Sequence, residues 1–110
     1  LIPASFLWSD VGQLHSIHKL LPKNTDLISK FSKNSLFLSV DSKNCLVSGS
    51  PNKLIGLVGV KNLAIIDTPQ GLLVCHLKKS YSVRDLVGLI VSHKNTSTYF
   101  LDKYDPNKAS

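Results

Sequence analysis

Three short apolar stretches recur 18 residues apart in this sequence: Leu36-Phe37-Leu38-Ser39-Val40, Leu54-Ile55-Gly56-Leu57-Val58 and Leu72-Leu73-Val74-Cys75-His76. A second pair repeats in step with them, because Lys43-Asn44-Cys45-Leu46-Val47 stands 18 residues before Lys61-Asn62-Leu63-Ala64-Ile65. Gly, Pro, Asn and Asp separate these runs of β-forming residues, a pattern typical of short strands. Three short strands in every 18 residues predict a parallel β-helix with triangular coils, whose stacked coils bury a common apolar face.

The repeat is too short to stand alone. Two to two and a half coils fit between Leu36 and Leu77, whereas a repeat array usually needs three or more units. We therefore expect another element to cap one end of the stack. A small antiparallel sandwich with regularly spaced turns is the alternative fold. The β-helix is favoured because whole blocks align, and not only their turns.

Helices are expected on both sides of the coil. After the third stretch the apolar residues change to helical spacing, and Ser82 and Asp85 occupy the positions of a capping box. The apolar face of this capping helix would hold Val83, Leu86, Val87, Ile90 and Val91. Near the N-terminus a helix would begin at Ser9 or Asp10 and stop at Pro22. Its apolar face would hold Val11, Leu14, Ile17, His18 and Leu21.

Two polar segments complete the chain. Residues 23–34 are rich in Lys, Asn and Ser and indicate a connection between two structural units. The tail beyond His93 is also polar and indicates a linker or a disordered segment. Within it, Tyr99-Phe100-Leu101 is apolar enough to dock.

Length and composition bound the class of protein. The chain has 110 residues, 43% of them hydrophobic, and carries 13 Lys+Arg against 7 Asp+Glu, a net charge of +6. This is one small folded domain at most, which excludes a TIM barrel or a complete two-domain enzyme. No apolar run approaches the ~20 residues that span a bilayer, so we expect no membrane association. The chain lacks Met and begins in an apolar stretch, so we expect a piece of a longer protein.

The basic charge does not indicate a nucleic-acid-binding protein. Its densest spots are Lys30-Phe31-Ser32-Lys33 and Lys78-Lys79, and the other basic residues are spread over turns and the tail. Few aromatic residues lie among them, so no base-stacking platform is evident. Turn lysines on a β-helix are more often a solvated face.

The cysteines and histidines form no recognisable metal or catalytic motif. Cys45 and Cys75 each lie in an apolar run, where a free Cys behaves as a small hydrophobic residue. We expect both to be structural, in keeping with a reducing, cytoplasmic compartment. His15 and His18 share one helical face, but no third zinc ligand stands at a suitable spacing. We expect these two to be surface or half-buried residues, and His76 and His93 to be isolated.

Four sequence motifs, in order, resemble those of mannose-1-phosphate guanylyltransferases. Phe6-Leu7-Trp8-Ser9-Asp10-Val11-Gly12 resembles the family's F-x-W-S-D-V/I-G segment, and Asp41-Ser42-Lys43-Asn44-Cys45-Leu46-Val47 resembles D-S-x-N-C-x-V/I. Residues 54–74 are similar to the pattern G-V-x-x-L-x-V-V-D-T-x-D-A-L-L-V, and Ser80-Tyr81-Ser82-Val83 resembles the S-Q-x-V that opens the family's last helix. The resemblance runs from about Phe6 to about Val91.

The resemblance implies a C-terminal position in such an enzyme, possessing a short left-handed β-helix. It divides the chain into the last segment of the nucleotidyltransferase domain with its connection (1–34), the β-helix (35–79), the capping helix (80–94) and the polar tail (95–110). Family enzymes join GTP and mannose 1-phosphate into GDP-mannose and pyrophosphate with Mg²⁺, and some are fused to a mannose-6-phosphate isomerase domain. The family's Gly-rich, Arg- and Lys-bearing nucleotide loop has no match among these 110 residues. The piece alone is therefore expected to be inactive.

The resemblance carries over one metal ligand and one weaker contact. Asp10 matches the family's metal-binding aspartate, and its alternative role is that of a helix N-cap. Gly12 would allow close approach of the backbone to substrate, or is an ordinary turn glycine. Trp8 is interpreted as a packing anchor. The sequence departs from the family at Gln13-Leu14, in place of Ser-Trp, and at Gln70-Gly71, in place of Asp-Ala, a change expected to be structural only.

Two other functions remain open. A short β-helix has open ends and an exposed face, so the chain could be a non-catalytic module that forms a homodimer. A hexapeptide-type acyltransferase also uses triangular coils, but it needs many more of them and a catalytic His between subunits.

Overall fold

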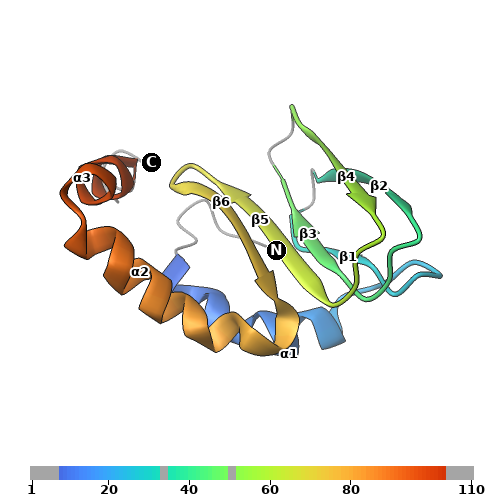
Figure 1. Cartoon of the computed structure of the whole chain (residues 1–110). Coiled ribbons are helices and arrows are strands. Elements are labelled where there is room, and N and C mark those ends of the chain that lie inside the picture. The colour runs from blue at the N-terminus through green and yellow to red at the C-terminus, as the bar shows by residue number, and fades with distance from the viewer. Residues whose placement is uncertain (1–7, 33–34, 50–51, 104–110) are drawn as a thin grey trace.

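The computed structural model describes residues 8–32, 35–49 and 52–103. In chain order its elements are η1 (Trp8–Gln13), α1 (Leu14–Leu20), β1 (Ser29–Lys30), β2 (Leu36–Val40), β3 (Leu46–Ser48), β4 (Leu54–Val58), β5 (Leu63–Thr68), β6 (Gly71–His76), η2 (Leu77–Ser82), α2 (Val83–Ser92) and α3 (Lys94–Lys103). Elements η1 and η2 are 3₁₀ helices. The strands form a four-stranded sheet, β1-β3-β5-β6, and a two-stranded sheet, β2-β4 (Figure 1). No helix in the described ranges is long and apolar enough to cross a membrane.

The predicted stacking of parallel rungs is confirmed for the middle of the chain. Strand β2 pairs in parallel with β4, so that Leu36 stands beside Leu54 and each residue meets the one 18 positions later. Strand β3 pairs in parallel with β5 at the same step, with Leu46 beside Ala64. A single parallel bridge between Lys43 and Lys61 joins the short third side. The sequence repeat is therefore the repeat of the coil.

The corners of the coil require left-handed backbone, which few residues adopt without strain. Asp41 and Gly59 occupy one corner with φ of 51° and 63°, and Asn44 and Asn62 occupy the next with φ of 54° and 62°. Gly, Asn and Asp tolerate this conformation best. Each of these pairs is 18 residues apart, so the turn residues repeat with the strands.

The stack begins earlier than the sequence predicts. Strand β1 pairs in parallel with β3, with Ser29 beside Leu46, so part of the segment interpreted as a connection is already a rung. The repeat is one residue shorter here, and the corner residue in register with Asn44 is Leu27, with φ of 60°. This irregular step hides the first rung from a search for 18-residue blocks.

The third block does not stack, contrary to prediction. Strand β6 folds back antiparallel on β5, so that Thr68 stands beside Gly71 and Leu63 beside His76. Pro69 and Gln70 form a two-residue turn, which can join only antiparallel strands because a parallel return needs a long crossover. The turn, and not the apolar pattern of β6, therefore decides where the coil ends.

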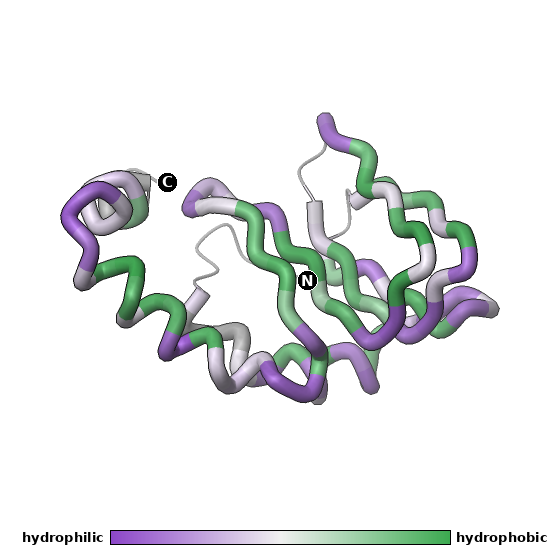
Figure 2. The backbone as a smooth tube through the Cα atoms, in the orientation of Figure 1, coloured by the Kyte–Doolittle hydropathy of each residue, from purple (hydrophilic) through white to green (hydrophobic). Residues whose placement is uncertain are grey.

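The core lies on both faces of the four-stranded sheet. Alternate residues of β3 and β5 point to opposite sides, so Val47 and Ile65 lie inside the coil while Leu46 and Ile66 face the helices. The coil core consists of Ile28, Cys45, Val47, Leu57 and Ile65. The helix-side core consists of Trp8, Leu14, Phe31, Leu46, Ala64, Ile66, Leu73, Leu77, Val83 and Phe100. Figure 2 shows apolar residues along β5 and β6 and also along the other strands and α2. Burial of β3 and β5 on both faces accounts for the continuous apolar runs of these two strands.

Both predicted helices are present, but they begin differently. Residues 8–13 form the 3₁₀ turn η1, so Asp10 lies inside this turn and the N-cap of α1 is Gln13. At the other end, Ser82 precedes α2 without a side-chain capping bond, so the expected capping box is wrong. The preceding turn η2 supplies the entry into α2 instead. Helix α2 packs Val87 and Ile90 against the helix-side core, beside the sheet.

The polar tail is helical, contrary to prediction. Helix α3 covers residues that have low helix propensity, including Thr96 and Thr98. The Thr96 hydroxyl donates to the carbonyl of Ile90 at 2.7 Å, and Phe100 is buried against Trp8. Tertiary contacts thus stabilise a helix whose sequence alone does not indicate one. Residues 104–110 of the tail lie outside the described residues.

Leu27 provides a test of the corner geometry. Its left-handed backbone costs a residue other than Gly, Asn or Asp about 1 kcal/mol, and its side chain is exposed. Leu27→Asn should therefore raise the free energy of unfolding by about 1 kcal/mol in urea denaturation. Leu20→Asn, a change at an exposed position at the end of α1, should give no gain. Equal or lower stability of Leu27→Asn would contradict this account of the corners.

Candidate functional site

The motif segment Trp8–Gln13 is held on the β5–β6 hairpin through Trp8. The indole Nε1–H donates to Oγ1 of Thr68 at 3.1 Å, and the backbone N–H of Trp8 donates to Oε1 of Gln70 at 3.5 Å. On its other side the indole meets the ring of Phe100 edge-on, with centroids 5.2 Å apart. Trp8 is buried, which confirms its interpretation as a packing anchor.

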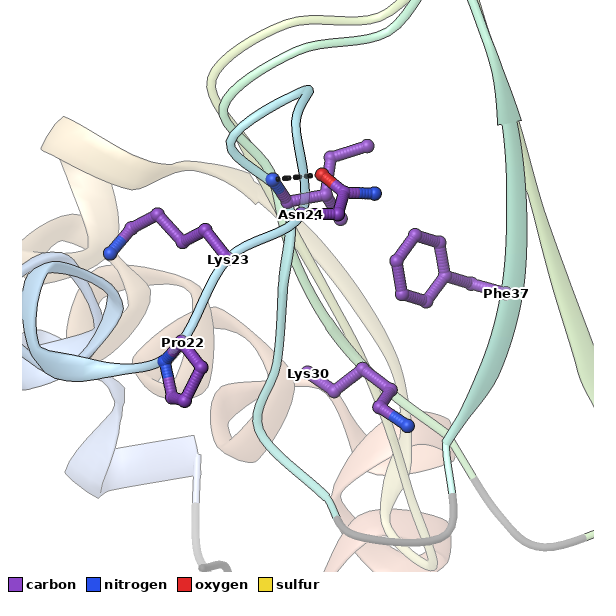
Figure 3. A pocket seen from close by; sticks show the side chains of 6 residues that line it. Pro22, Lys23, Asn24, Lys30 and Phe37 are labelled. Atoms are coloured by element: carbon purple, nitrogen blue, oxygen red, sulfur yellow. Dashed lines mark hydrogen bonds between the residues drawn. The ribbon is translucent and has the colours of Figure 1, made fainter.

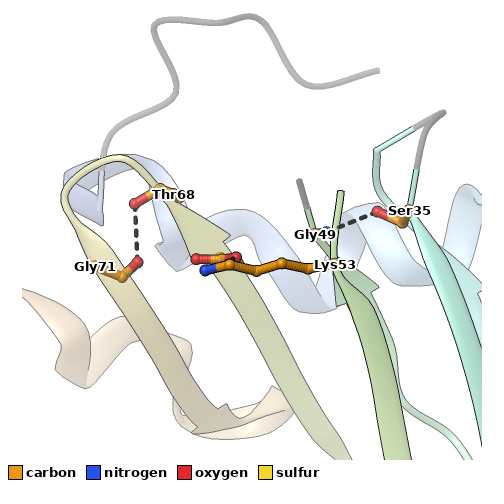
Figure 4. A network of polar contacts seen from close by, with 6 residues as sticks. Ser35, Gly49, Lys53, Thr68 and Gly71 are labelled. Atoms are coloured by element: carbon orange, nitrogen blue, oxygen red, sulfur yellow. Dashed lines mark hydrogen bonds and ion pairs between the residues drawn. The ribbon is translucent and has the colours of Figure 1, made fainter. Parts of the chain in front are cut away.

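The turn beneath Trp8 has no room for a larger residue at position 71. Gly71 has φ of 152°, and a Cβ there would stand 3.3 Å from Cζ2 of the indole. The Thr68 hydroxyl donates to the carbonyl of Gly71 at 3.1 Å and closes the turn (Figure 4). The departure from the family at Gln70-Gly71 thus lies directly against the motif tryptophan.

Asp10, the predicted metal ligand, lies in η1, and its side chain is outside the described part of the structure. No group of three His, Cys, Asp or Glu residues is assembled for a metal among the described residues. The segment can therefore offer one carboxylate and not a closed cage. Mg²⁺ usually takes one or two carboxylates together with waters and substrate phosphates, so one aspartate fits a shared magnesium site.

Gly12 lies on the exposed side of the same segment. A Cβ at this position would meet no atom of the described structure within 4 Å. The carbonyl of Gly12 accepts a hydrogen bond from the Ser80 hydroxyl at 3.5 Å, which ties η1 to η2. Packing does not explain the glycine, and the open space beside it is compatible with the predicted substrate contact.

A hollow of about 310 Å³ opens beside Trp8, between α3 and the β5–β6 turn. Its lining includes Trp8, Phe100, Tyr99 and Ile90, with Gln70 and Asn95 at its polar positions. The aromatic contact between Trp8 and Phe100 forms part of this wall.

A buried histidine joins α1 to the coil, whereas a surface or half-buried His18 was predicted. Its Nε2–H donates to Oδ1 of Asn44 at 2.8 Å, and its Nδ1 accepts from the Ser29 hydroxyl at 2.6 Å. Asn44 in turn donates from Nδ2 to Oδ1 of Asn62 at 2.7 Å. This arrangement uses neutral His18. Burial lowers the pKa of His18 below its ordinary 6.5, the charges of Lys23 and His15 lower it further, and the bond to Asn44 partly opposes them.

The two asparagines are residues whose role sequence reasoning missed. The signal was present, because Asn44 and Asn62 occupy the same column of the repeat. Asn is favoured where a left-handed turn must also offer a side-chain amide. One residue type thus satisfies the corner backbone and the ladder of amide bonds together.

The remaining histidines and cysteines form no reactive constellation in the described residues. His15 is half-buried, as predicted, and has no metal-binding partners. Nδ1 of His76 accepts from the backbone N–H of Lys78 at 3.0 Å, which caps η2. Cys45 is buried as predicted, and Cys75 is half-buried, where burial raises the pKa of its thiol. A raised pKa keeps Cys75 protonated and disfavours nucleophilic chemistry.

A second hollow, of about 250 Å³, lies where α1 passes into the first rung. Lys23, Asn24, Lys30 and Phe37 line it together with Pro22 and Ile28 (Figure 3). The Lys23 ammonium already donates to the carbonyls of Leu21 at 2.9 Å and Lys19 at 3.3 Å. Oδ1 of Asn24 accepts from the N–H groups of Asp26 and Ile28. Through these contacts Lys23 caps the end of α1 and Asn24 stabilises the turn that follows it.

An ion pair ties the coil to the hairpin that carries Trp8. The Lys53 ammonium lies 3.1 Å from the Asp67 carboxylate at the end of β5 (Figure 4). Lys53 is exposed, so the pair contributes about 0–1 kcal/mol. It orients the end of β5 more than it stabilises the fold.

These features define a parallel β-helix domain that carries, on its terminal hairpin, a short segment with a single candidate metal ligand. Residues 36–90 match the family described as the MannoseP isomerase/GMP-like beta-helix domain, and the chain belongs to this family.

Its relatives include alginate biosynthesis proteins and mannose-1-phosphate guanylyltransferases. The chain is 28% identical over 106 residues to the alginate biosynthesis protein AlgA of Pseudomonas syringae pv. tomato, covering 96% of this chain and 21% of that protein. It is 28% identical over 89 residues to a mannose-1-phosphate guanylyltransferase of Escherichia coli, covering 81% of this chain and 18% of that protein. The chain thus spans about a fifth of the length of the curated relatives it matches.

A solved structure shares the fold. The crystal structure of a mannose-1-phosphate geranyltransferase from Thermus thermophilus superposes with a TM-score of 0.60 at 18% identity. The match covers 73% of this chain and 23% of that one. At this identity the likeness supports the fold.

Neutral His18 predicts a definite pH dependence. The unfolded chain binds more protons than the folded protein between pH 6.5 and the lowered pKa of His18. The contribution of His18 to the free energy of unfolding should therefore be complete above pH 6.5. It should decrease as the pH falls below 6.5. His18→Gln should remove that part of the slope and cost about 1–3 kcal/mol at pH 7.5.

Urea denaturation between pH 5 and 8 measures both effects. His93→Gln is the matched control, because His93 lies exposed between α2 and α3. It should leave the free energy of unfolding at pH 7.5 within about 0.5 kcal/mol of wild type. An unchanged slope in His18→Gln would exclude His18 as its source.

Proposed function

We propose that this chain is the C-terminal β-helix part of a mannose-1-phosphate guanylyltransferase. The observation that carries the proposal is the similarity of 96% of the chain to an AlgA protein and of 81% of the chain to a mannose-1-phosphate guanylyltransferase. In the proposed reaction, a phosphate oxygen of mannose 1-phosphate attacks the α-phosphorus of GTP. The bond from this phosphorus to the bridging oxygen of the β-phosphate breaks, which forms GDP-mannose and releases pyrophosphate.

In this proposal Asp10 is a ligand of Mg²⁺ and Gly12 lies beside the substrate. When bound, Mg²⁺ would supply positive charge that neutralises the phosphates. The chain's own contribution is to present one carboxylate from a 3₁₀ turn fixed through Trp8 to the β5–β6 hairpin. A cytoplasmic location and a left-handed sense of the coil belong to the same proposal.

The 110-residue chain should not form GDP-mannose by itself. It offers one candidate carboxylate and no Gly-rich nucleotide loop. Incubation with GTP, mannose 1-phosphate and Mg²⁺, followed by chromatography of the nucleotides, should yield no GDP-mannose above a protein-free blank. A longer form that includes a catalytic domain is the positive control, and turnover by the short chain would contradict the proposal.

A second candidate function, a homodimerisation module, is favoured by the outer face of the β2–β4 sheet. Five large aliphatic side chains on this face are exposed: Leu36, Leu38, Val40, Leu54 and Val58. Both strands also have a free edge among the described residues. An apolar face with free edges is an association surface, and a second copy presents the same one.

Sedimentation equilibrium over a range of protein concentrations tests this module. The wild-type chain should dimerise, and Leu38→Lys should raise the dissociation constant at least about tenfold, since it places a charge in the centre of the face. Leu20→Lys, an exposed change on α1, should leave it unchanged. A wild-type chain that stays monomeric at every concentration would count against the module.

A further inference from the structure

We infer that Thr68, Gln70 and Gly71 of the β5–β6 turn are positioning residues that orient the segment Trp8–Gln13 and, with it, the backbone at Asp10. The inference rests on the proposed function, in which Asp10 is a magnesium ligand. It assigns to the β-helix domain a role at the metal site in addition to assembly.

The contacts to Trp8 are directional. Thr68 accepts from the indole N–H and Gln70 accepts from the backbone N–H of Trp8. Because one bond fixes the ring and the other fixes the main chain, the two together set both the position and the rotation of this residue. A purely apolar pocket would fix neither to the same degree.

The turn is matched to the indole by shape as well. Gly71 leaves space for the indole, since a Cβ there would stand 3.3 Å from Cζ2 of the ring. Phe100 of α3 makes an edge-on contact with the same indole, with ring centroids 5.2 Å apart. Trp8 is therefore held between the hairpin and the last helix.

The contacts that hold Trp8 also orient the backbone at Asp10, because Trp8 and Asp10 belong to one short 3₁₀ helix. Trp8 opens η1 and Asp10 follows two residues later. The other end of η1 is tied to η2 by the bond from Ser80 to the carbonyl of Gly12. With both ends fixed, the Asp10 backbone has a defined orientation before a metal arrives, which lowers the entropic cost of binding.

Trp8 is the single tryptophan of the chain, so the hydrogen bond of its indole can be measured directly. Its indole N–H gives one signal in a nitrogen–proton correlation spectrum. In Thr68→Val the exchange of this proton with solvent should be roughly five- to tenfold faster, the loss expected for one hydrogen bond. Thr68→Ser keeps the hydroxyl and should restore protection, and Thr98→Val, the same change on an exposed face of α3, should have no effect.

Mn²⁺ in place of Mg²⁺ tests the link to Asp10 in the same spectra. Paramagnetic broadening of the indole signal should occur in the wild-type chain and be lost in Asp10→Asn. Thr68→Val and Gly71→Ala should need several-fold more Mn²⁺ for half-maximal broadening, while Thr68→Ser should match wild type. Gly71→Ala keeps every hydrogen-bonding group and displaces the indole through its Cβ, so it perturbs Trp8 by a route other than loss of the Thr68 hydroxyl.

The outcomes separate the two ideas. Loss of broadening in Asp10→Asn, with wild-type Mn²⁺ midpoints in Thr68→Val and Gly71→Ala, would overturn the positioning role and leave the metal role intact. Undiminished broadening in Asp10→Asn would overturn the metal role and the positioning inference with it. Unchanged indole exchange in Thr68→Val would show that the hydroxyl does not hold Trp8.

Discussion

The left-handed corner at Asn44 and Asn62 is the constraint on which the coil depends. Parallel rungs can stack only if each rung turns at the same place, and both corners adopt φ near 60°. The amide of Asn44 donates to Asn62 above it and accepts from His18 of α1. The same side chain therefore keeps successive coils in register and attaches the N-terminal helix to them. Loss of this corner would loosen the helix as well as the stack.

The repeat in the sequence predicts the rungs correctly and their number incorrectly. Blocks of β-formers 18 residues apart indicate which strands pair, because a parallel coil must repeat its side-chain pattern. The same apolar pattern suits β6 in a parallel or an antiparallel position. Two turn residues, Pro69 and Gln70, decide between them. A local turn thus overrides a repeat that is otherwise regular, and the 17-residue step to β1 conceals the first rung in the opposite way.

Local sequence predicts two of the three α-helices in the described part of the chain. Periodicity predicts α1 and α2, while α3 depends on contacts from distant parts of the chain, above all Phe100 against Trp8. His18 follows the same rule. Its place on the apolar face is evident from spacing, but its burial follows from Ser29 and Asn44, which approach only once the coil has formed. At the candidate site, the motif indicates Asp10. The hydrogen bonds from Trp8 to Thr68 and Gln70 connect residues about 60 positions apart, so no local pattern predicts them.

The reversal of β6 has a consequence for function. A third parallel rung would have lengthened the coil and carried the chain away from η1. The hairpin instead returns the chain alongside β5 and places its turn against Trp8, where Gly71 admits the indole. From β6 the chain enters η2 and α2, which pack on η1 and on the helix-side core. The element that ends the β-helix is therefore also the one that holds the motif segment. This geometry gives a reason for a β-helix to follow the motif segment in one chain: the β-helix and its hairpin support a short turn that has too few residues to hold its own conformation.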